Sequence, residues 1–196
     1  MKQEPSFPAD LAATWLDPLE RLAIAYAPRA VRPAWAGFLA LDRRLADAAR
    51  EGRDPLMIQL RLAWWRDRFA QPAAQWPSEE PLLALLLAWD DDRATLGALV
   101  DGWEARNVGQ DGGAELAIAR IAAVGALARR SGVAADDTVR RAAAEWLGHA
   151  PAGPAPRLPR AMRPLAILRG MALREGQGGS PVGNALAAMR FAIRGR

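Results

Sequence analysis

Residues 54–69 read DPLMIQLRLAWWRDRF, and this stretch says more about the fold than any other part of the chain. Asp54 and Pro55 are typical of a helix start, because an Asp side chain accepts backbone N–H groups and Pro suits the first helical position. The adjacent Trp64 and Trp65 each need a large apolar site and a partner for the indole N–H. The stretch therefore predicts a helix that carries two bulky anchors.

The apolar residues of this helix predict which of its faces is buried. Met57, Leu60 and Trp64 share one face through their i, i+3 and i+4 spacing, and Arg61 lies at its border. We therefore expect Trp64 to be buried and Trp65 to be half-exposed.

Proline, glycine and capping residues divide the rest of the chain into further helices. β-branched residues are sparse, and no segment alternates between apolar and polar residues as a strand does. We expect helices at about residues 17–26, 34–51, 54–71, 78–89, 92–107, 114–130, 136–148, 160–175 and from 181 onward. A length of 196 residues suits one core, so the sequence predicts a single all-α domain over residues 1–196.

The composition excludes several classes of site. The chain has no Cys, so a disulfide framework, a thiolate metal site and a Cys nucleophile are all excluded. The longest apolar run, residues 82–89, is too short to span a bilayer, and the N-terminus lacks the apolar segment of a signal peptide. We therefore expect a cytoplasmic protein, with peripheral attachment to an inner membrane as a further option.

Charge is unevenly distributed along the chain. The net charge is +4, but residues 151–196 contain eight Arg and a single acidic residue, so they carry +7 and the first 150 residues carry −3. A basic C-terminal region favours an anionic partner, such as a diphosphate, a lipid headgroup, a nucleic acid or an acidic protein surface. The alternative is that these Arg side chains are simply solvated.

The segment from residue 32 to residue 69 resembles the squalene/phytoene synthase family. Members of that family carry an Arg-Pro pair, a helix with an aspartate-rich motif and a helix with R-L-x-W-W-R, and residues 61–66 read RLAWWR. Weaker similarities follow at residues 99–102 (LVDG), 146–150 (WLGHA) and 157–159 (RLP). The resemblance implies a helical bundle with a truncated isoprenoid synthase fold.

The resemblance also implies two aspartate-rich motifs that hold magnesium ions, which bind the substrate diphosphates. The first motif would place aspartates at positions 46 and 50, where this chain has Ala46 and Arg50. Asp42 lies one turn earlier and points inward, and Asp47 lies near the edge of the apolar face. An Arg at a ligand position repels a cation. The expected carboxylate pair is therefore missing.

The second aspartate-rich motif has no counterpart. In the family it lies between the two weakly similar segments, but here only residues 151–156, PAGPAP, separate them. Residues 146–174 contain neither Asp nor Glu. We therefore predict that the chain has no catalytic residues, no metal site and no cofactor. Magnesium is expected only if the chain is an enzyme after all.

Groove or diphosphate-binding candidates lie on the two helices of the resemblance, and they are Asp42, Arg43, Asp47, Arg50, Arg61, Trp64, Trp65 and Arg66. In a functional interpretation, Arg61 or Arg66 points at a diphosphate or carboxylate while a Trp lines an apolar tunnel. In a structural interpretation, the Trp rings are core anchors and the Arg side chains form ion pairs with Asp42, Asp47 or Asp67.

Other polar clusters have simpler explanations. Asp90, Asp91 and Asp92 are typical of a helix N-terminal cap. Asp101 and Glu104 share a helix face, where solvation or ion pairing is expected rather than cation binding. His149 lies beside a glycine at a helix end, which favours a surface residue over a general base.

These observations predict a non-catalytic protein that resembles the squalene/phytoene synthases, a pseudoenzyme with a binding or assembly function. Family members with the same loss include assembly factors for respiratory complex I, which the resemblance therefore implies as a model. The alternative is a prenyltransferase of isoprenoid biosynthesis, or a protein that binds prenyl diphosphates. The expected partners are a protein or an isoprenoid or other lipid, with peripheral membrane association as an option, and no nucleic acid.

Overall fold

The computed structural model describes residues 15–109 and 113–175, and over these ranges the chain forms helices and turns without a β-strand. The α-helices are α2 (Pro18–Ala25), α3 (Arg32–Ala48), α4 (Pro55–Ala70), α5 (Pro81–Leu86), α6 (Arg93–Val108), α7 (Ala114–Arg130), α8 (Asp137–Trp146) and α9 (Arg163–Glu175). Short 3-10 helices are η1 (Arg29–Val31), η2 (Ala73–Gln75), η3 (Leu87–Asp92) and η4 (Arg160–Met162). The predicted all-α class is confirmed for these ranges. The helix predicted from residue 181 lies outside the described residues.

Side-chain caps start three helices close to residues 17, 54 and 136, where the sequence predicts helix starts. Asp17 and Glu20 form a reciprocal capping box at the start of α2, in which Asp17 Oδ1 accepts the Glu20 N–H at 2.8 Å. Asp54 Oδ1 accepts two N–H groups of α4, at 2.8 and 3.1 Å. Asp136 accepts a backbone N–H of α8 at 3.0 Å. These bonds satisfy N–H groups that have no partner inside the helix, so they define where each helix begins.

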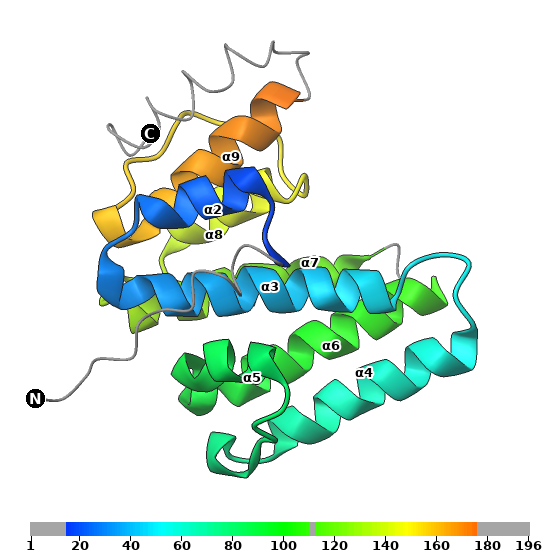
Figure 1. Ribbon diagram of the computed structural model, residues 1–196. Coiled ribbons are helices and arrows are strands. Elements are labelled where there is room, and N and C mark those ends of the chain that lie inside the picture. The colour runs from blue at the N-terminus through cyan, green and yellow to red at the C-terminus, as the bar shows by residue number, and fades with distance from the viewer. Residues whose placement is uncertain (1–14, 110–112, 176–196) are drawn as a thin grey trace, which may run out of the picture.

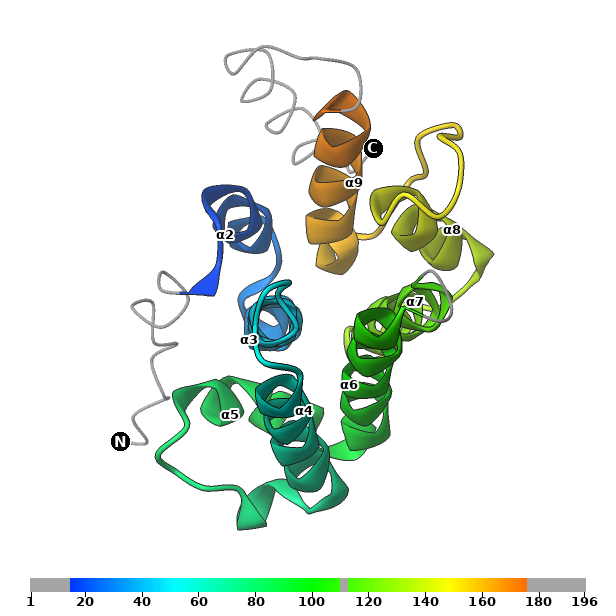
Figure 2. The same cartoon turned by 90° about the vertical axis from the view of Figure 1, so that its right-hand side faces the viewer.

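Helix α3 runs through the centre of the molecule, with α2 and α9 on one side and α4 and α5 on the other (Figures 1 and 2). Its first half is buried all round, including Trp35 and Phe38. Two indole N–H groups fasten neighbouring segments to it: Trp35 Nε1 donates to the Ala161 carbonyl at 3.1 Å, and Trp89 Nε1 donates to the α3 backbone at 3.0 Å. A helix that is apolar on every side is typical of such a central position.

Two glycines allow helices to approach closely. A Cβ at Gly37 of α3 would lie 2.8 Å from the Leu85 carbonyl oxygen of α5. A Cβ at Gly102 of α6 would lie 2.7 Å from the Leu116 Cα of α7. Both distances are shorter than a carbon side chain permits, so these two helix pairs approach to within a distance that only glycine allows.

The buried face of α4 differs from the predicted one. Ile58, Leu62, Trp65 and Phe69 are buried, and Trp65 is only 4% exposed. Trp64 is 36% exposed. The prediction that Trp64 is buried and Trp65 half-exposed is therefore wrong.

The physical reason lies in the partners of the buried face. Trp65 stacks on Phe69 with ring centroids 5.7 Å apart, and Phe69 meets Trp76 edge-on at 5.9 Å. Trp76 then donates its N–H to the Arg68 carbonyl at 2.7 Å, which closes the aromatic cluster over the end of α4. Both faces of α4 carry apolar residues at helical spacing, so these contacts with a distant segment decide which face is buried.

A buried ion pair joins α8, α9 and the segment between them. Glu145 accepts a hydrogen bond from Arg169 Nε, and the two side chains are 1% and 7% exposed. Arg169 Nη2 also donates to the Gly153 carbonyl at 2.8 Å. Residues 147–159, between these two helices, contain no helix.

One continuous apolar cluster includes side chains from α2 through α9, although the assignment of residues 1–196 to a single domain stays a prediction. None of the described helices combines the length and the apolar character needed to cross a membrane.

Candidate functional site

A groove lies between the second half of α3 and the middle of α4. Its lining side chains come from α3, the turn after it, α4 and the start of α5, and they are Arg44, Asp47, Ala48, Arg53, Arg61, Trp64, Trp65 and Glu80. The groove has a volume of about 350 Å³ and is partly open to solvent, a size typical of a small-ligand site. We call it the α3–α4 groove.

Carboxylates neutralise two of the three guanidinium groups in this groove. Arg53 Nη2 lies 2.9 Å from Asp47 Oδ2, and Arg50 binds the other oxygen of Asp47 from the rim. Arg44 Nη2 lies 3.6 Å from Glu80 Oε2, a weaker contact. Asp47 is therefore held between two arginines and has no free oxygen.

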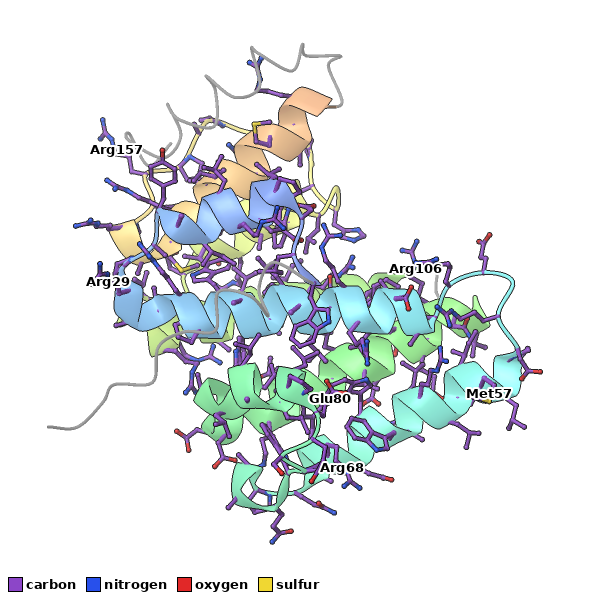
Figure 3. The ribbon with its side chains drawn as sticks, in the orientation of Figure 1. Arg29, Met57, Arg68, Glu80, Arg106 and Arg157 are labelled. Atoms are coloured by element: carbon purple, nitrogen blue, oxygen red, sulfur yellow. The ribbon has the colours of Figure 1, made fainter. Side chains whose placement is uncertain are left out.

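Glu80 enters the groove because it caps α5. Its Oε1 accepts the Leu82 N–H at 3.2 Å, while Oε2 faces Arg44. The sequence predicts that this helix starts at about residue 78 with Ser78 as its cap. That start is wrong, because α5 begins only at Pro81 and Glu80 is its cap. Glu80 lies between α5 and α4 in Figure 3.

Arg61 carries the unpaired charge of the groove. Among residues 15–109 and 113–175, it has neither an ion-pair partner nor a hydrogen-bond acceptor. The indole N–H groups of Trp64 and Trp65 likewise find no acceptor in the described part of the chain. Four other tryptophans do donate to protein acceptors: Trp35, Trp76, Trp89 and Trp103. The groove is thus lined by one guanidinium and two tryptophan side chains whose donors have no acceptor among the described residues.

Asp42 lies outside the groove, on the side of α3 that faces α6 and α7. Its Oδ1 accepts from Trp103 Nε1 at 2.8 Å and from Arg120 Nε at 3.0 Å, and its Oδ2 lies 2.8 Å from Arg120 Nη2. The Arg120 guanidinium also stacks over the Trp103 ring. Asp42 points inward as expected, but it serves to join three helices.

Arg43 turns toward α2 and lies outside the groove. Its Nε donates to Glu20 Oε2 at 2.6 Å, and its Nη2 binds Asp17. Burial raises the pKa of Glu20 above its usual value, and the hydrogen bond from Arg43 opposes only part of that effect. Arg43 therefore ties α3 to the cap of α2.

Arg66 also lies outside the groove, against α6. Its Nε donates to Asp101 Oδ1 at 2.8 Å, and its Nη2 binds Glu104. The hydrogen bond to Asp101, followed by the one to Glu104, raises the pKa of Arg66. The expectation of an ion-paired Asp101 and Glu104 is confirmed. The expected pairing of Arg61 and Arg66 with Asp42, Asp47 or Asp67 is wrong.

The predicted candidates therefore separate into two groups. Asp47, Arg61, Trp64 and Trp65 line the groove, and Arg50 joins them at the rim through Asp47. The remaining three candidates form contacts between helices elsewhere in the molecule. They are Asp42, Arg43 and Arg66. The sequence interpretation missed Arg44, Arg53 and Glu80. Arg44 lies three residues before Asp47 on the same helix, a spacing that places both on one side, whereas no local pattern indicates Glu80.

The other polar clusters have structural roles. Asp92 occupies the cap position of α6 but makes no capping hydrogen bond, and it pairs instead with Arg130 at 2.7 Å. Asp90 Oδ1 accepts the Ala73 N–H at 2.8 Å. The predicted cap position is therefore correct at Asp92, although the Asp92 side chain makes no capping hydrogen bond. His149 is exposed just after α8, where a surface residue is expected.

Comparisons with protein-family models, with curated proteins and with solved structures found no match to this chain. Membership of the squalene/phytoene synthase family therefore stays a prediction. Within the described ranges, no three His, Asp or Glu side chains are grouped so that they could hold a metal ion.

Proposed function

We propose that this chain is a non-catalytic protein resembling the squalene/phytoene synthases, with a truncated isoprenoid synthase fold, that binds an anionic ligand in the α3–α4 groove. Its action is binding, or assembly of a partner protein, rather than chemistry on the ligand. The observation that carries this proposal is the unpaired Arg61 guanidinium beside two indole N–H groups without acceptors.

The carboxylates of α3 do not fit the magnesium site that the resemblance implies. Asp42 and Asp47 face different neighbours, and each already binds guanidinium groups through both oxygens. Position 46 is Ala and position 50 is Arg, which pairs with Asp47. A magnesium ion needs several oxygen ligands that converge, and here an ion would have to displace two arginines from Asp47. This arrangement supports a function without prenyl transfer.

The groove suits a ligand that carries an anionic group next to an apolar segment. A guanidinium binds a phosphate or carboxylate through two parallel hydrogen bonds, and an unpaired one contributes more because no internal ion pair has to be broken. The rings of Trp64 and Trp65 supply an apolar wall beside Arg61. The groove volume of about 350 Å³ is in the range of small-ligand sites and admits a diphosphate group.

Calorimetric titration without magnesium tests the binding part of the proposal. Farnesyl diphosphate and inorganic diphosphate are titrated into the wild-type chain, Arg61→Gln and Arg157→Gln. Arg157 is an exposed arginine at the opposite end of the molecule (Figure 3), so it controls for the loss of one positive charge. We expect Arg61→Gln to weaken binding at least about tenfold, because a charge-assisted hydrogen bond is lost, and Arg157→Gln to leave it unchanged.

Equal binding by Arg61→Gln and wild type, or no binding by wild type, would refute the groove as an anion site. The non-catalytic part has its own test, in which the wild-type chain is incubated with farnesyl or geranylgeranyl diphosphate and magnesium. Formation of a prenyl product would refute it and support the transferase alternative.

A further inference from the structure

Helix α4 exposes a stripe of large apolar side chains. Leu56 is 67% exposed and Leu60 is 55% exposed, and Met57 and Trp64 are exposed on the same side of the helix. These residues lie opposite the buried face formed by Ile58, Leu62, Trp65 and Phe69, and Met57 projects away from the molecule in Figure 3. We call Leu56, Met57, Leu60 and Trp64 the α4 stripe.

The stripe differs from the other exposed apolar residues because its four members are neighbours on one side of a single helix. Elsewhere in the described ranges, exposed large apolar side chains occur one to a helix, such as Leu22 on α2 and Ile118 on α7. Single exposed apolar residues are normal on protein surfaces, whereas a contiguous group marks an interaction surface.

One edge of the stripe is basic. Arg61 and Arg68, seven residues apart, lie along the same edge of α4, and neither has a carboxylate partner in the described part of the chain. The Arg68 guanidinium lies 5.5 Å from the centre of the Trp64 ring. Arg66, at the opposite edge, is neutralised by α6. Asp67 is the acidic residue near the last turn of the stripe, so the excess positive charge lies beside Trp64.

The Trp64 side chain presents both an apolar ring and a polar N–H group. Its ring contacts Trp65 edge-on at 4.9 Å, and the side chain is 36% exposed with no acceptor for its N–H among the described residues. Tryptophans of this kind are enriched where a membrane meets water, since the ring enters the apolar layer and the N–H meets headgroup oxygens.

We propose that α4 docks in the plane of a lipid bilayer that contains anionic lipids. Leu56, Leu60 and Trp64 enter the boundary between headgroups and acyl chains, and Arg61 and Arg68 meet lipid phosphates. An apolar face flanked by arginines and bordered by tryptophan is typical of helices that lie on a membrane. The basic edge favours an anionic bilayer over a second copy of this chain, whose own Arg61 and Arg68 would repel it. This inference goes beyond the proposed function. Arg61 and Trp64 also line the groove, but Leu56, Leu60 and Arg68 do not, so docking does not require a ligand in the groove.

Vesicle flotation with the full chain tests the inference. Vesicles of phosphatidylcholine alone are compared with vesicles containing about 30% phosphatidylglycerol, at low and at raised salt. We expect binding to the anionic vesicles that salt weakens. Leu60→Gln should reduce this binding about tenfold, because one largely exposed leucine no longer enters the apolar layer. Arg68→Gln should reduce it on anionic vesicles about fivefold, because each arginine near an anionic surface contributes to binding.

Ile118→Gln is the matched control, because Ile118 is at least as exposed as Leu60 but lies alone on α7. Both positions are on the surface, so neither change removes core packing. Equal vesicle binding by Leu60→Gln and wild type would overturn the inference, as would equal losses in Leu60→Gln and Ile118→Gln. A dimer that Leu60→Gln dissociates, without any vesicle binding, would make the stripe a protein interface and also overturn it. Leu60→Gln should still bind diphosphate like wild type, so the stripe and the groove can fail separately.

Discussion

Arg169 and Arg61 lie on opposite sides of α3, and their environments differ. At the α8–α9 junction, Arg169 is buried and its donors bind Glu145 and the Gly153 carbonyl. On α4, Arg61 lines an open groove and has no partner among the described residues. A charge removed from water must be paired to be tolerated, whereas a charge left unpaired beside apolar rings is available to a ligand. The junction therefore holds the fold together, and the α4 side is the surface available for binding.

Removing the carboxylate from the junction should give the largest effect. Glu145→Ala leaves the buried Arg169 guanidinium without its partner, so we expect a loss of about 3–5 kcal/mol in the free energy of unfolding. Urea denaturation followed by circular dichroism measures it. Arg141→Ala is the control, because Arg141 contacts Glu145 at 3.3 Å but is largely exposed, and it should cost below about 1 kcal/mol. Similar losses in both variants would contradict the structural role of the buried pair.

The adjacent tryptophans offer a comparison within α4 itself. Trp65→Ala should cost about 3–4 kcal/mol, because it empties a buried site between Trp64 and Phe69. Trp64→Ala removes an exposed ring and should cost about 1 kcal/mol or less. Both free energies come from the same urea titrations. The reverse order would restore the face predicted from the sequence.

Asp42 tests whether an inward carboxylate of α3 is structural or functional. Asp42→Ala should cost about 1–3 kcal/mol, since Arg120 and the Trp103 N–H lose their shared acceptor. Diphosphate affinity in the groove should stay within about twofold of wild type, because Asp42 does not line it. A loss of affinity much larger than this, in a variant that remains folded, would make Asp42 part of the ligand site.

Replacing Asp90 should give the smallest change in stability, and the size of this change should depend on pH. The Ala73 N–H, followed by Arg93, holds the pKa of Asp90 below its ordinary value. The ionised form is therefore favoured by folding, so its contribution is present above about pH 4 and is lost as the pH falls through the lowered pKa. Asp90→Asn should have a slightly lower Tm than wild type at pH 7, and the two curves should converge below about pH 3. A Tm difference that persists in acid would refute this origin.

Local chemistry made much of the fold predictable. The caps at Asp17, Asp54 and Asp136 satisfy N–H groups within one turn, so they act wherever they occur in the chain. Part of the groove was also predictable, because two of its residues lie on helices that follow each other in the sequence. Asp47 lies near the end of α3 and Arg61 lies on α4, the next helix along the chain.

Contacts between distant segments account for what the sequence did not reveal. The choice between two apolar faces of α4 depends on Trp76, which follows a separate 3-10 turn. The role of Asp42 depends on Arg120, 78 residues further along the chain. Spacing rules describe neighbours on one element and carry no information about such partners.

The close contact of Gly37 with Leu85 has a consequence for the width of the groove. Glu80 sits one residue before α5, so it moves wherever α5 moves. A methyl group at position 37 would press on the α5 backbone and push that helix outward, and the acidic wall of the groove would retreat with it. Arg44 would then lose its weak partner and become a second free cation. Gly37 does not line the groove, but its lack of a Cβ lets α5 lie close enough to α3 for Glu80 to face Arg44.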